Sequence, residues 1–237
     1  MDRNRLISLS YKYKGEYPRI YEAIKTKQEA DIVQIDNCLT IFDDDYPKEL
    51  FNLRYPPLVL YYKGNLELLK TRKIGIVGSR VPCEYALKAT RSLVRANNDK
   101  TIISGLAKGI DACAHENALK TIGVLGCGIN YIYPSCNKDL YRRIENEGLI
   151  ISEYPDMVAP LGYHFPFRNR IISCLSDIAY VMQSTQKSGT MTTINEALEL
   201  GKEVRVLPYD IFDIYGTNNN KLIHEGATPI IKDEIAF

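Results

Sequence analysis

Short apolar runs alternate with longer helical patterns along most of this chain. Residues 74–77 form a run rich in β-branched side chains, and the run is too short for a helix. Gly78 and Ser79 follow it, and apolar positions in residues 82–96 then recur with helical spacing. The pattern predicts a buried strand, a tight turn and a helix, which is the unit that opens doubly wound α/β sheets.

The same alternation continues towards the C-terminus and begins somewhat earlier in the chain. The further predicted strands are 39–42, 56–62, 101–104, 121–125, 149–152, 177–182 and 203–208, and the predicted helices between the later ones are 107–119, 138–145 and 190–200. Short apolar runs that alternate with helical spans indicate βαβ units. For residues 39–237 we expect an extended Rossmann-like fold, with a doubly wound, mostly parallel sheet and helices on both faces.

Residues 1–38 have a different character. They are polar and rich in tyrosine and lysine, with a weak helical pattern around Ile20, Ala23 and Ile24. We expect a small helical N-terminal segment of one or two helices, with too few apolar residues for a core of its own.

Composition limits the classes of function. The 237 residues are 45% apolar and 25% charged, as in an ordinary globular protein, and the net charge is +1. A nucleic-acid partner would therefore need positive charge gathered locally. The six cysteines form no Cys-x-x-Cys pair, and neither a signal-peptide pattern nor a membrane-length apolar run is present. We expect a cytoplasmic protein with reduced thiols.

Small residues follow several of the predicted strands. They are Gly78-Ser79, Ser104-Gly105, Gly126, Ser152 and 188–190. Ligands of open parallel sheets bind beyond the carboxyl ends of the strands, where free backbone N–H groups can hold anions. One such turn can be only a tight connection, but several together predict an anion-binding edge, to which Arg80 adds a positive charge.

Familiar catalytic patterns are missing. The stretch 78–83 lacks the second and third glycines of a dinucleotide-binding loop. Asp111 and His115 lie four residues apart and could form an acid–base pair; the alternative, which we favour, is a helix-capping aspartate and an ordinary histidine. We expect no catalytic residue, no metal site and no cofactor.

The most unusual stretch is 164–172, where aromatic and basic residues are interleaved. Phe165 and Phe167 precede a predicted helix that opens with Arg168, Asn169 and Arg170. Arginine forms paired hydrogen bonds with phosphate, and exposed rings beside basic groups hold the bases of single strands. The alternative is that the phenylalanines belong to the core and the arginines are only solvated.

Many short elements between residues 40 and 228 together form one recognisable pattern. They are Tyr46-Pro47, Pro56-Pro-Leu-Val-Leu-Tyr61, Lys63-Gly64, Ile76-Val-Gly-Ser-Arg80, Ile103-Ser-Gly-Leu-Ala107, Gly109-Ile-Asp111, His115, Tyr133-Pro134, Asn137-Lys138, Ile151-Ser-Glu153, Phe165-Pro166, Arg168-Asn-Arg-Ile-Ile172, Ser188-Gly-Thr190, Thr193, Ala197, Asn220, Leu222-Ile223 and Gly226-Ala227. In these elements the chain resembles the DNA-processing protein A family, also called DprA or Smf.

The resemblance implies a homodimeric protein without catalytic activity and without a membrane association. It would bind single-stranded DNA in a basic pocket at the strand ends during natural transformation and help to load the RecA recombinase. Arg80 matches the family's pocket arginine, Lys138 matches a lysine of the Asn-Lys element, and 165–170 match the aromatic-basic segment. The predicted nucleic-acid-binding residues are Gly78, Ser79, Arg80, Gly105, Lys108, Lys138, Phe165, Phe167, Arg168, Asn169, Arg170, Ser188, Gly189 and Thr190.

The sequence departs from the family pattern in several places. Residues 1–38 resemble a shortened form of the sterile-alpha-motif-like domain that many members carry, and we expect too little chain before Phe237 for the winged helix that ends many others. Gln183 stands where the family often has glutamate.

Two other classes of function stay open. One is a nucleotide phosphoribohydrolase of the lysine-decarboxylase-like (LOG) family, which needs Gly-Gly-x-Gly-Thr-x-x-Glu. Here Thr185-Gln186 replaces the paired glycines and Thr193 the glutamate. The other is a protein that senses a nucleotide or another phospholigand at the same edge.

Overall fold

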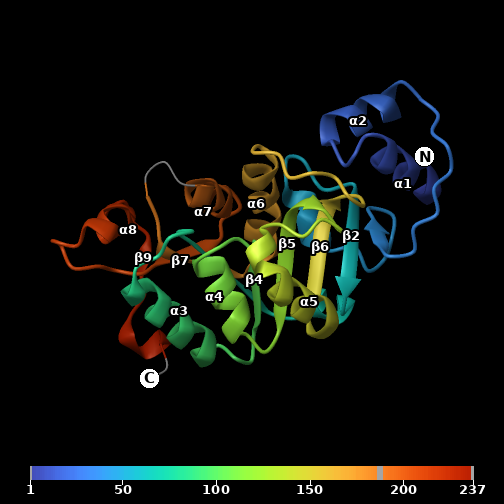
Figure 1. Cartoon of the computed structure of the whole chain (residues 1–237). Coiled ribbons are helices and arrows are strands. Elements are labelled where there is room, and N and C mark those ends of the chain that lie inside the picture. Colours follow the sequence, from blue (N-terminus) through green and yellow to red (C-terminus); the bar gives the residue numbers. More distant parts are fainter. Residues whose placement is uncertain (1, 186–188, 236–237) are drawn as a thin grey trace.

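The computed structural model describes residues 2–185 and 189–235 (Figure 1). A nine-stranded sheet runs through the described part of the chain, in the order β1-β2-β6-β5-β4-β3-β7-β8-β9. The strands are β1 Cys38–Thr40, β2 Val59–Gly64, β3 Lys73–Gly78, β4 Thr101–Ser104, β5 Thr121–Gly128, β6 Leu149–Tyr154, β7 Ile178–Gln183, β8 Glu203–Val206 and β9 Thr228–Pro229.

Helices precede the sheet and connect most of its strands. The α-helices are α1 Arg3–Lys12, α2 Tyr17–Lys25, α3 Glu84–Ala96, α4 Ile110–Asn117, α5 Lys138–Glu147, α6 His164–Leu175, α7 Gly189–Glu199 and α8 Thr217–His224. Short 3₁₀ turns occupy Lys48–Asn52, Leu66–Lys70, Ser135–Asn137, Ile214–Gly216 and Lys232–Glu234.

The sheet is mostly parallel, as the sequence predicted. β1 pairs antiparallel with β2, and β2 pairs antiparallel with β6; the pairs from β6 through β9 are parallel. β3 lies between β4 and β7, and the chain reaches these two neighbours through helices on opposite faces. This arrangement confirms the doubly wound α/β fold and makes the carboxyl end of β3 its topological switch point.

Alternating side chains of β3 pack on the two faces. Ile74 and Ile76 join a buried cluster with α3 and α4, whereas Val77 joins the cluster that includes α6 and α7. Gly75 faces α6, where a Cβ would lie 2.4 Å from the Ser176 hydroxyl. The glycine therefore lets α6 approach the sheet closely.

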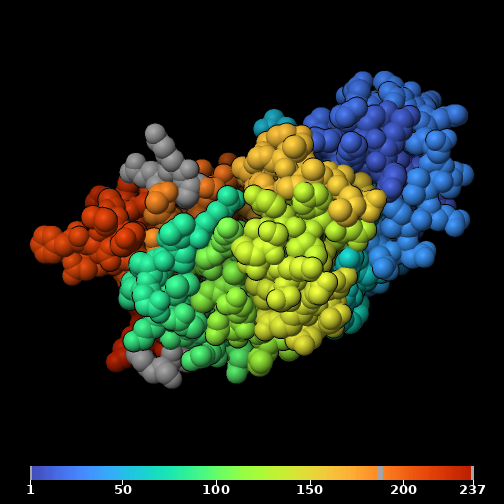
Figure 2. All heavy atoms as spheres, viewed as in Figure 1, coloured from blue at the N-terminus to red at the C-terminus, as the bar shows by residue number. Residues whose placement is uncertain are grey.

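The N-terminal helices pack onto the sheet beside β2. Leu6, Ile20 and Ala23 share a buried cluster with Val59 and Tyr61. The surface of the α6 start and the preceding loop (gold) lies against this N-terminal segment (blue) in Figure 2. The predicted helices of this segment are present; its description as a separate domain ending at residue 38 stays a prediction.

One predicted helix start was clearly misplaced, and one strand was missed. The helix predicted to open at Arg168 begins at His164, so that Phe165 and Phe167 lie inside it. Pro166 is compatible with this start because the first turn of a helix needs no N–H from it. The two-residue strand β9 was not predicted, since Thr228 and Pro229 show no apolar run. Within the described residues, no helix is both long and apolar enough to cross a membrane.

Candidate nucleic-acid interface

A cavity of about 660 Å³ opens at the carboxyl ends of the central strands, and a second one of about 260 Å³ adjoins it. Residues after β3, β4 and β7 and the first turns of α6 and α7 line the larger cavity, which therefore lies at the topological switch point. Both cavities share a wall made of Arg80, Ala107, Tyr133 and Phe165.

The turn after β3 is held in place by the loop after β4. The Ile110 N–H donates to the carbonyl of Ser79 at 3.1 Å, and the Ser79 hydroxyl accepts a hydrogen bond from the Val81 N–H at 3.1 Å. Gly109 has a φ of +76°, and a Cβ there would lie 2.3 Å from the Ser79 carbonyl oxygen. Glycine tolerates both constraints, and this allows the loop after β4 to approach the turn after β3 closely. Gly78 and Ser79 line the cavity as predicted.

Arg80 is the exposed cation of this wall. Its guanidinium lies 5.7 Å from the centre of the Phe165 ring, and the Tyr133 ring lies 5.5 Å from the Phe165 ring. A cation and two partly exposed rings thus converge where the two cavities meet. Tyr133 was missing from the predicted site residues, although its Tyr-Pro element was part of the family resemblance and could have indicated it.

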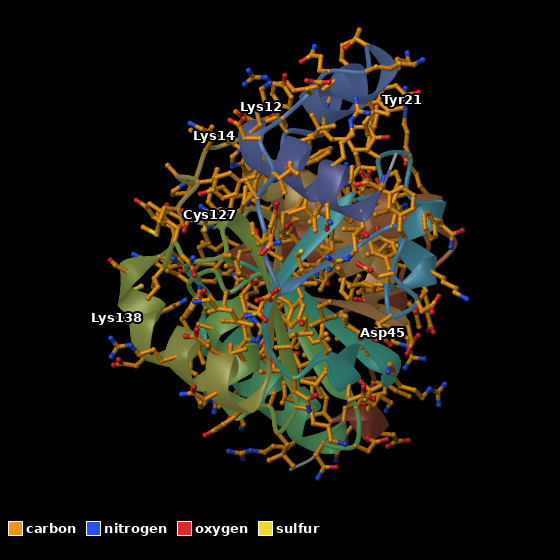
Figure 3. All side chains as sticks on the ribbon, turned by 90° about the vertical axis from the view of Figure 1, so that its right-hand side faces the viewer. Lys12, Lys14, Tyr21, Asp45, Cys127 and Lys138 are labelled. Atoms are coloured by element: carbon orange, nitrogen blue, oxygen red, sulfur yellow. The ribbon has the colours of Figure 1, made fainter. Side chains whose placement is uncertain are left out.

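Gly105 and Lys108 line the smaller cavity, and Lys108 is exposed. A Cβ on Gly105 would lie 2.4 Å from an Nη atom of Arg168, so this glycine leaves room for the guanidinium. Lys138, the first residue of α5, is exposed but lines neither cavity. Figure 3 shows it projecting from α5, away from the N-terminal segment.

Arg168 lines the larger cavity but is only 4% exposed. It donates to the carbonyls of Gly105, at 2.7 Å, and of Val124. Burial lowers the pKa of Arg168, and the charge of Asp111 opposes this shift. Burial likewise raises the pKa of Asp111, which accepts hydrogen bonds from the N–H groups of Gly105 and Ala107. Arg168 thus braces the loop after β4 against β5, and its part in nucleic-acid binding stays a prediction.

Arg170 departs further from the prediction, because it is 3% exposed and lines neither cavity. It donates to Glu153 at 2.6 Å, and its guanidinium lies 3.7 Å from the Phe167 ring centre. Residues two apart on a helix point about 200° apart, so Arg168 and Arg170 reach opposite sides of α6. Phe167 shares the side of Arg170, and its ring lies 6.3 Å from that of Tyr55.

The start of α7 forms the opposite wall of the larger cavity. Gly189, Thr190 and Asn169 line it, and the Asn169 amide donates to the carbonyl of Gly189 at 3.1 Å. Ser188, also a predicted site residue, lies outside the described residues. Thr193 was not predicted; it lines the cavity, and its buried hydroxyl has no hydrogen-bond partner in the described structure.

His115 lies in the core, where both of its ring nitrogens have hydrogen-bond partners. Its Nε2 accepts from the Leu106 N–H at 3.3 Å, so that Nδ1 carries the proton towards Thr121 Oγ1, 2.6 Å away. Burial lowers the pKa of His115 to about 3, with help from the charges of Arg143 and Arg168. His115 is thus a hydrogen-bonded core histidine, in line with the favoured alternative. The expected capping role of Asp111 was wrong: the N-cap of α4 is Gly109, and Asp111 holds the loop before the helix.

Among the described residues, no three or more histidine, cysteine, aspartate or glutamate side chains are grouped so that they could hold a metal ion. The cysteines are all free thiols.

Comparison with known proteins identifies the family. The model of DNA recombination-mediator protein A matches residues 37–236. The chain is 42% identical to DNA processing protein DprA of Streptococcus pneumoniae, over 79% of this chain and 68% of that protein, and 37% identical to that of Bacillus subtilis, over 100% and 80%.

Solved structures agree with this assignment. The structure of DprA from S. pneumoniae superposes with a TM-score of 0.81 at 34% identity and covers 99% of this chain and 94% of that one. That of DNA processing protein A from Helicobacter pylori, described for its single-stranded DNA binding mode, has a TM-score of 0.77 at 37% identity and covers 83% and 92%. The chain belongs to the DNA-processing protein A (DprA/Smf) family.

Proposed function

We propose that this protein binds single-stranded DNA without sequence preference, protects it during natural transformation and helps to load RecA onto it. The observation that carries the proposal is the convergence of Arg80, Phe165 and Tyr133 where the two cavities meet. Arginine suits a phosphate, and partly exposed rings suit the faces of bases.

The rest of the cavity wall supports a phosphate-bearing ligand. The turn after β3 and the start of α7 both face the larger cavity, and free N–H groups at such positions bind anions. Phosphates and base faces are common to every sequence, so that we expect no sequence preference. The H. pylori relative, which was described for its single-stranded DNA binding mode, supports the same ligand.

We include no catalytic step in the proposal. Thr193 occupies the position of the glutamate that a phosphoribohydrolase of the LOG family would need. Asp111 is the one carboxylate among the described residues that line the larger cavity, and one of its oxygens already accepts two backbone N–H groups. It is poorly placed to act on a ribose.

The protein partners we propose are RecA and a second copy of the chain, on the basis of family membership. A run of exposed apolar side chains around the turn at Ile214–Gly216 supports a contact of this kind. It comprises Ile211, Phe212, Ile214 and Tyr215.

Fluorescence anisotropy with a labelled thymidine oligomer tests the DNA proposal. We expect Arg80→Ala to weaken binding and to reduce the slope of log affinity against log salt by about 0.7, the value for one phosphate contact on a single strand. Its melting temperature should stay close to that of the wild type, because Arg80 is exposed. Lys88→Ala, which removes an exposed charge from α3, is the matched control and should bind normally.

Duplex DNA and AMP serve as competitors in the same assay. We expect both to displace the oligomer poorly. Absence of oligomer binding at low salt, together with binding or cleavage of AMP, would contradict the proposal and favour a nucleotide enzyme or sensor.

A further inference from the structure

Four aromatic rings form a continuous series from α2 to the first turn of α6. The rings of Tyr21 and Tyr17 are stacked with centres 5.9 Å apart, Tyr17 and Tyr55 meet edge to face at 5.3 Å, and Tyr55 and Phe167 lie 6.3 Å apart. We call this series, Tyr21, Tyr17, Tyr55 and Phe167, the aromatic ladder. No residue of it lines either cavity.

The ladder is more exposed than packing of the N-terminal helices requires. Tyr17, Tyr21 and Lys25 follow one another at intervals of four residues along α2, while the neighbouring helix face buries Ile20 and Ala23. Tyr21 is 46% exposed and Tyr55 is 39% exposed. Figure 3 shows Tyr21 on the opposite side of the N-terminal segment from Lys12 and Lys14.

Cations accompany the exposed rings. The Lys25 ammonium lies 4.8 Å from the centre of the Tyr21 ring, and the Arg54 guanidinium lies 5.2 Å from that of Tyr55. Both cations are at the surface, and neither has an ion-pair partner in the described structure. Glu22 is the exposed carboxylate of α2, one helical position away from Tyr21. The surface cations therefore outnumber the acids along the ladder.

The ladder and the cavity lie on opposite sides of the first turn of α6. Phe165 and Pro166 line the cavity, and Phe167, the next residue, is the last ring of the ladder. The Tyr163 hydroxyl donates to Glu16 at 2.7 Å, directly before α2, which fixes the N-terminal segment against this turn. A strand leaving the cavity over α6 would reach the exposed ring of Tyr55 next.

We propose that the aromatic ladder is a second single-strand binding surface, which takes the nucleotides beyond those held in the cavity. The inference rests on the proposed function and extends it to a longer site that includes the N-terminal segment. Exposed rings interleaved with cations suit bases and phosphates together, whereas the core of a protein–protein interface is depleted in charged residues such as lysine.

Oligomer length separates the two surfaces. We would measure anisotropy with thymidine oligomers of about 4 and about 16 nucleotides, which are the limits of known site sizes per single-strand binding fold. Tyr21→Ala should weaken binding of the longer oligomer at least about fivefold, the lower limit for loss of one stacked base. It should leave binding of the shorter oligomer unchanged, because we expect the cavity residues alone to hold an oligomer of this length.

Matched variants control for surface changes. Tyr11→Ala removes a tyrosine of similar exposure from α1, outside the ladder, and should have no effect at either length. Arg54→Ala tests the ladder while leaving all four of its rings in place. Arg72→Ala, which removes another exposed arginine, is its control. If Tyr21→Ala unfolds the N-terminal segment, Arg54→Ala still decides, and it should weaken binding of the longer oligomer only.

A tryptophan gives an independent signal, since the chain contains none. In Tyr21→Trp, we expect the longer oligomer to quench the indole fluorescence and the shorter one to leave it unchanged. Ladder variants that bind both lengths as the wild type does, while Arg80→Ala weakens both, would overturn the ladder and leave the cavity proposal intact. If the wild type binds neither oligomer at low salt, the proposed function itself fails, and the ladder with it.

Discussion

The arginines of α6 show what a linear sequence hides. Arg168 and Arg170 look equivalent as aromatic-basic residues, yet one braces β4 and β5 and the other pairs with Glu153 in the core. Neither partner lies near them in the sequence, so that no local pattern could reveal their burial. The position of Arg80 could be predicted, because it follows a strand and a glycine–serine turn directly. Such a residue lies at the carboxyl end of the strand, and this placement does not depend on its long-range contacts.

His115 gives a pH-dependent prediction. Its pKa falls from 6.5 to about 3 on folding because it is fully buried. Above pH 6.5 both states are neutral; below it only the unfolded state gains the proton, so that the free energy of unfolding falls by about 1.4 kcal/mol per pH unit. This contribution is therefore complete at neutral pH and is lost on acidification.

His115→Gln removes that titration while keeping polar atoms at the site. We expect the variant to be less stable than the wild type at neutral pH, and the difference to shrink by about 2 kcal/mol between about pH 6.5 and pH 5. Urea denaturation at both pH values measures this. A difference that stays constant would mean that folded His115 accepts a proton at mild pH.

The elements of the sheet were more predictable than the helix that carries the site. Most strands of the central sheet are short apolar runs bounded by glycine, and their positions follow from that pattern alone. The start of α6 was misplaced because Pro166 looks like a helix break in sequence, whereas it lies in the first turn, where proline is tolerated. The contact of Tyr133 with Phe165 is tertiary and has no local pattern, so that only the Tyr-Pro element of the family resemblance could have indicated this residue.

The contact between β3 and α6 gives a stability prediction. In Gly75→Ala the new Cβ would lie 2.4 Å from the Ser176 hydroxyl and 3.2 Å from its Cβ. We expect the free energy of unfolding to fall by about 1–3 kcal/mol, the usual cost of overpacking. Chemical denaturation checks this, with Gly162→Ala as a control that has nothing within 4 Å of the added methyl.

Removing the clashing hydroxyl should restore part of the loss. We expect Gly75→Ala combined with Ser176→Ala to be more stable than Gly75→Ala alone, since the worst contact then disappears. If the second substitution lowers the free energy of unfolding further, the close approach of α6 is not the reason for the glycine.

At the scale of the whole molecule, we predict that the exposed apolar run near Ile214–Gly216 forms the contact between two copies of the chain. Phe212 is 87% exposed and is flanked by the exposed Ile211 and Ile214, and a group of exposed apolar side chains of this kind often marks a contact with another protein. We expect the wild type to form a dimer and Phe212→Ser to be monomeric at the same concentration. At a concentration at which both are monomeric, the two proteins should have the same melting temperature. Light scattering after size exclusion measures both masses; Tyr11→Ala should remain dimeric. Equal masses for wild type and Phe212→Ser would remove this run from the contact.

The two ends of the sheet bear on how copies of the chain can meet. Long, flat edge strands would allow strands of other chains to pair with the sheet through backbone hydrogen bonds. Here the border strands are only three residues, Cys38–Thr40, and two residues, Thr228–Pro229, and the second contains a proline that cannot donate. Two copies of the chain would therefore recognise each other through side chains, and such contacts can be specific and reversible. The described border strands offer little backbone for the repeated strand addition that leads to fibres.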